Sequence, residues 1–238
     1  MVARTFSRSA AAIPAEIVTL CRQEDEIVNG GDDPTSADHP SAPIVNVRGE
    51  RVALGPLHRE LLALIERWDN DFRTVDLGGD DPGPRSAESL SASWEPLLRG
   101  ERNDWIGFAI YALPDLRPIG VINIRDFTNP HGTAEFGITI GDPGDRGQGF
   151  GTEATRLLLD YAFTVLGVHN VWLDTPAYNA GAIRAYEKAG FREIGRRRGA
   201  RTLAGRRYDV VLMDCIAEEF VPLATPVLPE IGARTDQR

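Results

Sequence analysis

A glycine-rich loop has the composition of a phosphate-binding turn. It reads Arg146-Gly147-Gln148-Gly149-Phe150-Gly151-Thr152 and lies between a strand-like run, Thr133–Ile140, and a helix-like run, Glu153–Leu166. Glycine lets the backbone approach a ligand closely, and the first N–H groups of a helix are unpaired and partly positive. Such a backbone binds phosphate oxygens, and the Arg146 guanidinium can add a charged contact. We therefore expect a pyrophosphate-bearing ligand at this junction.

Hydrophobic periodicity predicts the elements that must position this loop. The strand before the loop and the strand after its helix make one βαβ crossover, which we expect to be parallel and right-handed. We expect the remaining strands to be antiparallel, so the fold class is mixed α/β. The expected strands are Arg51–Leu54, Trp105–Leu113, Ile119–Ile124, Thr133–Ile140, Val171–Asp174, Phe191–Arg198 and Arg207–Met213, and the expected helices are Leu57–Trp68, Ser86–Leu98, Thr152–Leu166 and Ala180–Ala189, the last ending at Gly190.

Length and composition favour a globular, cytoplasmic enzyme. The chain has 238 residues and a net charge of −9, which gives no long-range attraction for a nucleic acid. No apolar run approaches the roughly 20 residues that span a bilayer, so we expect no membrane partner. The two cysteines, Cys21 and Cys215, form neither a metal-spaced cluster nor a disulfide framework. We therefore expect no structural metal.

Composition divides the chain into three segments. Residues 1–43 look like an N-terminal extension and linker, residues 44–220 like the globular domain, and residues 221–238 like a C-terminal tail. The extension combines a short amphipathic pattern with an acidic, turn-forming stretch from Asn29 to Pro43. Two interpretations stay open for it: a disordered or wrongly assigned start, or a homodimer contact or substrate lid.

A dinucleotide-binding site is one alternative for the glycine loop. The stretch Gly149–Ala154 fits the pattern G-x-G-x-x-G/A, and Asp174 ends a strand about where the ribose-binding acid is expected. However, the stretch Gly141–Arg146 separates the loop from its strand, although the pattern should follow its strand directly. The chain also offers a single βαβ unit, where that fold needs several. This alternative is therefore disfavoured.

A second interpretation uses more of the chain. The spacing Arg146-x-x-Gly149-x-Gly151 matches the acyl-CoA pyrophosphate loop, Q/R-x-x-G-x-G/A, of the GCN5-related N-acetyltransferases, and the segment Asn179–Phe191 resembles their second signature. From Ile44 to Phe220 the chain resembles the ribosomal-protein-serine/alanine N-acetyltransferase branch, in which the segments Ala134–Ile138 and Tyr208–Met213 also fit. The resemblance implies the fold of that superfamily, with acetyl-CoA as co-substrate.

The resemblance also implies the chemistry, which is direct attack of an amine on the thioester in a ternary complex. That reaction needs close positioning, a deprotonated amine, an oxyanion donor and a proton for the leaving thiolate. Tyr186 is the candidate general acid, and Asn179 lies two helical turns before it. Glu135 and Asp174 are candidate bases, and ordered water is a third. We expect His131 and His169 to be surface residues.

The donor site implied by the resemblance combines the loop with a strand edge. The backbone of Ile138–Ile140 would pair with the pantetheine arm in the gap between two splayed strands. The expected acetyl-CoA-binding residues are Ile138, Thr139, Ile140, Arg146, Gly147, Gln148, Gly149, Phe150, Gly151, Thr152, Asn179 and Tyr186.

The acceptor is less well defined by the sequence. The branch favours a protein N-terminal α-amine, while the same scaffold also serves small amines, because a fold does not fix its substrate. We expect the glycine-rich loop Asp76–Arg85 to shape the acceptor site, and the arginines at 196–198 and 206–207 to belong to a solvated hairpin. A non-catalytic acyl-CoA-binding regulatory domain is the alternative function, against which Tyr186 and Glu135 argue.

Overall fold

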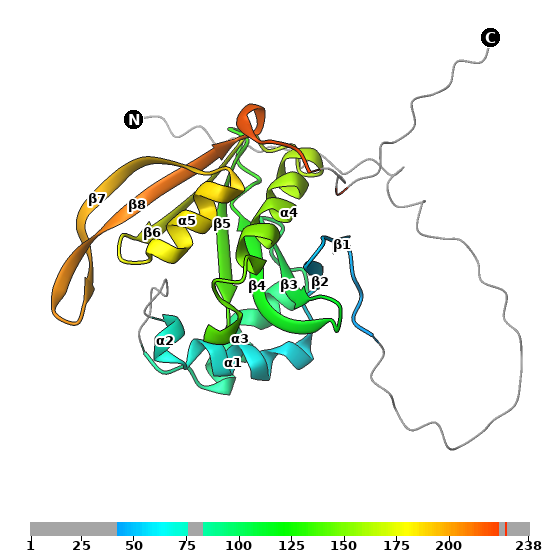
Figure 1. Cartoon of the computed structure of the whole chain (residues 1–238). Coiled ribbons are helices and arrows are strands. Elements are labelled where there is room, and N and C mark those ends of the chain that lie inside the picture. Colours follow the sequence, from blue (N-terminus) through cyan, green and yellow to red (C-terminus); the bar gives the residue numbers. More distant parts are fainter. Residues whose placement is uncertain (1–41, 76–82, 224–226, 228–238) are drawn as a thin grey trace, which may run out of the picture. The chain divides into compact units, whose positions relative to one another are not determined.

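The computed structural model describes residues 42–75, 83–223 and 227 of the chain (Figure 1). Residues 1–41 of the expected extension (residues 1–43) and most of the expected tail over residues 221–238 lie outside the described residues. Within the described part, no helix is both long and apolar enough to cross a membrane.

The described strands form one eight-stranded sheet in the order β1-β2-β3-β4-β5-β6-β8-β7. Only β5 and β6 pair in parallel, and the other neighbouring pairs are antiparallel. The mixed α/β class with one parallel crossover is thus confirmed, and the repeated parallel units of a dinucleotide fold are absent from this sheet. The strands are β1 (Val47–Arg48), β2 (Val52–Pro56), β3 (Trp105–Ala112), β4 (Arg117–Arg125), β5 (Thr133–Ile140), β6 (Asn170–Pro176), β7 (Arg192–Leu203) and β8 (Arg206–Ile216).

Helices cover both faces of the sheet. Alternate residues of β2 and β3 enter two different apolar clusters, as expected for a strand whose successive side chains point to opposite faces. Helix α4 (Phe150–Thr164) packs in one cluster, with α5 (Ala180–Ala189) beside it, and α1 (Leu62–Asp69) and α3 (Ala87–Leu98) pack in the other. The remaining helical segments of the described residues are α2 (Phe72–Val75) and three short 3₁₀ turns at Arg59–Leu61, Pro143–Asp145 and Ala217–Glu219.

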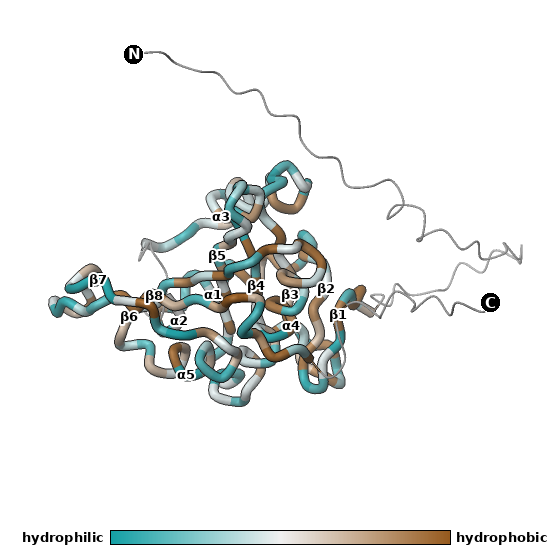
Figure 2. The backbone as a smooth tube through the Cα atoms, turned by 90° about the horizontal axis from the view of Figure 1, so that it is seen from above, coloured by the Kyte–Doolittle hydropathy of each residue, from teal (hydrophilic) through white to brown (hydrophobic). Residues whose placement is uncertain are grey.

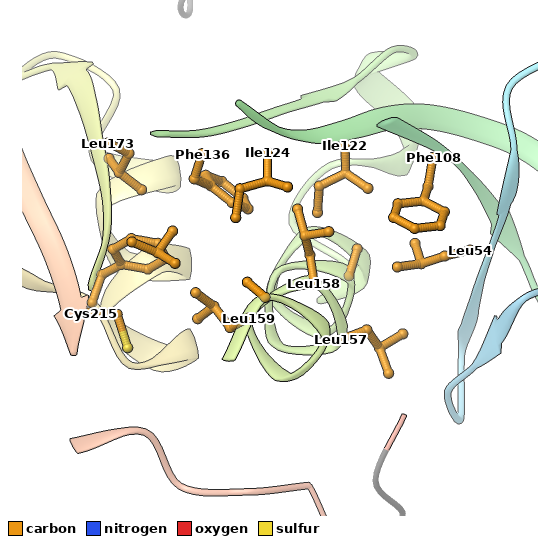
Figure 3. Close-up of a cluster of buried hydrophobic side chains, with 14 of the residues drawn as sticks. Leu54, Phe108, Ile122, Ile124, Phe136, Leu157, Leu158, Leu159, Leu173 and Cys215 are labelled. Carbon is orange, nitrogen blue, oxygen red and sulfur yellow. The ribbon is translucent and has the colours of Figure 1, made fainter. Parts of the chain in front are cut away.

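The larger cluster lies between α4 and the middle of the sheet. Leu157, Leu158 and Leu159 are successive residues of α4 that contact this cluster (Figure 3). Opposite them lie the side chains of Leu54, Phe108, Ile122, Ile124 and Phe136 from four neighbouring strands. This packing holds α4 against the sheet and thereby fixes the position of its N-terminus, where the glycine loop ends.

Local sequence signals determine several helix ends. Ser86 caps α3 by accepting a hydrogen bond from Ser89 N (3.2 Å), and α5 has its predicted bounds, ending at Gly190 with φ of 119°. Helix α4 begins at Phe150 rather than at Thr152, because Gly149 in the left-handed region already ends the loop. Strand β5 has its predicted bounds, Thr133–Ile140.

The closing hairpin is longer than expected. β7 was predicted to end at Arg198, yet β7 and β8 continue to a two-residue turn at Ala204 and Gly205, both with positive φ. Pairing is irregular between Arg197 and Arg201, and there Asp209 accepts a hydrogen bond from the N–H of Gly199 (2.9 Å). The far end of the hairpin is mostly hydrophilic (Figure 2), in agreement with the expected solvated hairpin.

Truncation of Leu158 tests the packing that fixes α4. Leu158 is fully buried, so Leu158→Ala should lower the free energy of unfolding by about 2–5 kcal/mol through lost burial and a cavity. Val165→Ala, at the exposed end of the same helix, is the matched control. It should change the free energy of unfolding by less than about 1 kcal/mol. Urea denaturation measures both, and equal losses would contradict this role for Leu158.

Candidate active site

The parallel pairing of β5 and β6 stops after three residue pairs. Thr133, Ala134 and Glu135 pair with residues 170–172, and the register ends there. Beyond Glu135, β5 stays paired with β4 as far as Ile140, while β6 stays paired with β8 as far as Pro176. Within the described residues, the β6-facing edge of β5 from Phe136 to Ile140 therefore has no strand partner. Apart from the Ile140 carbonyl, which accepts hydrogen bonds from Arg146, the N–H and C=O groups that point out from this edge can pair with an extended amide ligand.

The predicted strand residues Ile138, Thr139 and Ile140 all lie on this edge, but on two faces. The side chains of Ile138 and Ile140 lie under the start of α4, within 4.0 Å of where a Cβ on Gly151 would be. Thr139 is exposed on the opposite face, toward α1 and α3. This unpaired edge of β5 thus presents side chains to both faces of the sheet.

The glycine loop has the backbone geometry of an anion-binding turn. Gly147 and Gly149 have φ of 71° and 87°, and residues 147–149 are exposed. The first hydrogen bond of α4 runs from Glu153 N to Gly149 O (3.1 Å). The N–H groups of Phe150, Gly151 and Thr152 precede it and have no partner within the helix. Together with the helix dipole, they make this end attractive to phosphate.

The Arg146 side chain is turned toward the protein backbone. Its guanidinium donates hydrogen bonds to the carbonyls of Ile140 (3.1 Å), Gly141 (2.8 Å) and Arg73 (3.0 Å). Burial lowers the pKa of this guanidinium, partly opposed by the nearby charge of Asp71. The side chain therefore fastens the loop to the end of β5 and to α2, and its expected contact with a phosphate stays a prediction.

Two acidic side chains just before the glycine loop anchor it to neighbouring elements of the fold. Asp145 is buried and accepts two hydrogen bonds from Arg117 (2.7 and 2.8 Å), which hold the pKa of Asp145 below its usual range. Asp142 accepts hydrogen bonds from Arg67 (2.8 Å) and from the Trp68 indole (3.4 Å), both on α1. The loop is thus preorganised by charge-assisted hydrogen bonds to β4 and α1.

Tyr186 lies where the gap between the strands begins. Its ring packs edge-on against Phe136 (centroids 5.9 Å apart), the first residue of β5 after the last parallel pair, and near Phe191 (6.0 Å). Burial, and secondarily the charge of Asp174, raise the pKa of Tyr186 to about 12. The hydroxyl is therefore a proton donor at any physiological pH. Asn179 caps the same helix, accepting a hydrogen bond from Ala182 N (3.3 Å).

The two candidate bases differ in their relation to Tyr186, because the charge of Asp174 acts on the Tyr186 hydroxyl and Glu135 lies on another face. Glu135 is largely buried, pairs with Arg125, and belongs to the face of β5 opposite Ala134 and Phe136. Asp174 is exposed on β6. The histidines are surface residues, as expected: His131 is exposed, and His169 is 3.4 Å from Glu218 at an exposed site. The structure thus places Tyr186 and Glu135 on opposite faces of one strand.

A pocket on the Glu135 face was missed by the sequence analysis. It encloses about 80 Å³ between α1, α3, β4 and β5. Asp69 borders it 3.4 Å from Arg85, and burial raises the pKa of Asp69 while Arg85 opposes the shift. The buried Oδ1 of Asn123 has no hydrogen-bond partner among the described residues. The lining residues are Ile65, Trp68, Asp69, Trp94, Val121, Asn123 and Thr139.

The expected acceptor loop is attached beside this pocket. Asn70 and Arg85 exchange two hydrogen bonds (2.8 and 2.9 Å) across the base of the loop Asp76–Arg85, of which residues 76–82 lie outside the described residues. A larger cavity of about 260 Å³, between the end of α3 and β3, contains none of the predicted site residues, so we do not assign the reaction to it. Nothing in residue spacing pointed to Asp69 or Trp94, because four separate elements build this pocket.

Sequence and structure comparisons show which known proteins this chain resembles. A family model described as an acetyltransferase (GNAT) domain matches residues 51–192. Spermidine N(1)-acetyltransferase of Escherichia coli K12 is 31% identical over 142 residues, covering 59% of this chain and 72% of that protein. A putative ribosomal N-acetyltransferase, YdaF of Bacillus subtilis, is 27% identical over 137 residues, covering 58% and 74%. The crystal structure of spermidine N-acetyltransferase from Vibrio cholerae in complex with CoA and spermine has a TM-score of 0.64 at 26% identity, covering 71% of this chain and 96% of that one.

Replacement of Gly149 tests the glycine loop as the phosphate site. Gly149→Val puts a branched side chain at a φ of 87° and over the free N–H groups, so acetyl-CoA affinity should fall by at least about 100-fold. Gly144→Ala is the control, because a Cβ there meets nothing within 4 Å. Calorimetric titration of each folded variant measures the affinity. Unchanged binding by Gly149→Val would refute the assignment.

Proposed function

This chain belongs to the GNAT acetyltransferase family and is an acetyl-CoA-dependent N-acetyltransferase, and we propose that its acceptor is a small polycationic amine. We place the phosphates of acetyl-CoA at the glycine loop and its pantetheine arm along the free edge of β5. The acceptor then enters from the opposite face, beside α1 and α3. The pocket bordered by Asp69, Trp68 and Trp94 is the observation that carries the choice of acceptor.

The chemistry of this pocket suits an alkylammonium group. A carboxylate and the faces of tryptophan rings both attract a cation, and the free carbonyl oxygen of Asn123 adds an acceptor for an N–H donor. Since a water molecule occupies about 30 Å³ in the liquid, the pocket has room for roughly an aminoalkyl end. Two of the similar proteins reported above are named spermidine N-acetyltransferases, in agreement with such an acceptor.

The proposed reaction uses both faces of β5. The neutral amine attacks the thioester carbon, a C–N bond forms, and the C–S bond breaks with its electron pair on sulfur. Tyr186 donates its hydroxyl proton to the departing thiolate, since its high pKa keeps it protonated. The proton lost by the amine passes to water, directly or by way of Glu135 or Asp174. Holding the two reactants next to each other in the gap reduces the entropic cost of bringing them together.

Removal of the Tyr186 hydroxyl tests the proposed acid. Tyr186→Phe should lower kcat by roughly 100-fold or more while acetyl-CoA affinity stays within about twofold, because the ring packing is kept. Wild-type activity should rise as the amine deprotonates and show no decline from Tyr186 ionisation below about pH 11, since its pKa is about 12. Tyr161→Phe, a half-buried tyrosine of α4, is the control and should keep full activity. An unchanged kcat for Tyr186→Phe would remove this residue from the mechanism.

Neutralisation of Asp69 tests the acceptor. Asp69→Asn should raise the KM for spermidine by roughly tenfold or more and leave acetyl-CoA affinity unchanged, because a charge-assisted contact with the ammonium is lost. Glu60→Gln, an exposed acid outside the pocket, is the control.

A substrate comparison completes this test. Spermidine, spermine and a panel of short peptides with free N-terminal α-amines are assayed for kcat/KM with the wild-type protein. Higher values for the polyamines, reduced by Asp69→Asn, support the proposal. Higher values for the peptides would instead assign the protein to N-terminal acetylation.

A further inference from the structure

The turn between β1 and β2 is attached to the first turn of α4. Glu153 Oε1 accepts hydrogen bonds from the backbone N–H groups of Glu50 (2.6 Å) and Arg51 (3.0 Å). The approach is so close that a Cβ on Gly49 would lie 2.2 Å from the same oxygen. A turn about 100 residues away in sequence is therefore fixed beside the end of the glycine loop.

This attachment brings the Arg51 side chain to the helix N-terminus. The Arg51 guanidinium carbon lies 5.2 Å from the centroid of the Phe150 ring, a cation–π contact. Its Nη1 lies 2.8 Å from where a Cβ on Gly149 would be. The residue is exposed, and no carboxylate of the described residues forms an ion pair with it. A cation is thus held over the glycine loop, and no acidic side chain in the described part of the chain is paired with it.

Arg51 can therefore do what was expected of Arg146. The Arg146 guanidinium is occupied by backbone carbonyls, whereas that of Arg51 borders Gly149 and Phe150, where the free N–H groups begin. We propose that Arg51 binds a phosphate group of acetyl-CoA, and that Glu153 is the residue that positions it. This inference rests on the proposed donor site. CoA carries a pyrophosphate and a 3′-phosphate, and either offers the oxygens that a guanidinium prefers.

Donor binding in the absence of acceptor tests the proposal. Arg51→Gln should weaken acetyl-CoA binding by roughly 10- to 100-fold, the range for loss of a charge-assisted contact. Arg48→Gln makes the same change of charge on the same hairpin and should bind like the wild type. Binding of S-acetylpantetheine, which lacks these phosphates, followed by thermal shift, should be equal for Arg51→Gln and wild type.

A third ligand separates the two phosphates. With 3′-dephospho-acetyl-CoA, equal binding by Arg51→Gln and wild type assigns the contact to the 3′-phosphate, and a persisting defect assigns it to the pyrophosphate. Either result supports the proposal. Wild-type affinity for acetyl-CoA from Arg51→Gln, or an equal defect with S-acetylpantetheine, would overturn it. Failure of the wild-type protein to bind acetyl-CoA would instead refute the donor site itself.

Glu153 variants test the positioning role. Glu153→Ala removes the oxygen that accepts both backbone N–H groups, so it should weaken acetyl-CoA binding, and Glu153→Gln, which keeps an oxygen acceptor, should restore most of it. The double variant Glu153→Ala, Arg51→Gln should be no weaker than Arg51→Gln alone, because both changes remove one contact. Additive losses in the double variant would contradict a role for Glu153 through Arg51.

Discussion

The early end of the β5–β6 pairing is the constraint on which the site depends. Backbone N–H and C=O groups inside a protein must find partners, and a strand that leaves its neighbour exposes a row of them. Here pairing ends at Glu135, within a sheet that is otherwise continuous from β1 to β7. The helices on one face are packed so that α4 begins just beyond the end of β5 and α5 begins just beyond β6. The free edge therefore lies between the helix end that we propose as the phosphate site and the tyrosine on α5.

Alternation along β5 divides the reaction between two faces. Phe136, Ile138 and Ile140 face the helices that frame the proposed donor site. Glu135 and Thr139 lie on the opposite face, where Thr139 lines the pocket of α1 and α3. A nucleophile from one side and a thioester from the other can meet only where the sheet is open. In the proposed arrangement the two substrates come together without sharing one cavity. It also explains why the proposed acid and the buried carboxylate lie on separate faces.

Local sequence patterns allowed much of the fold to be predicted. The contacts between segments that are distant in sequence could not be predicted from such patterns. The bounds of β5 and α5 followed from periodicity, and Ser86, Asn179 and Gly190 act within one helical turn of themselves. The place where two strands separate depends on how whole helices pack, so residue patterns located the loop, whereas the gap was expected only from the family resemblance. Asp69 and Trp94 become neighbours only through folding. Arg51 reached the loop through a hydrogen bond to Glu153, a pair that no spacing rule connects. Arg146 matched its pattern, although its side chain turned toward the backbone.

The hydrogen bonds from α1 and α2 to the glycine loop have a thermodynamic consequence. Asp142 is bound by Arg67 and Trp68, and Arg146 is bound to the carbonyl of Arg73, so the helices beside the acceptor pocket and the loop of the donor site share one set of contacts. We therefore expect binding of the proposed acceptor beside α1 and binding of acetyl-CoA at the loop to be coupled through these contacts. By linkage, any factor by which one substrate changes the affinity for the other must apply equally in reverse.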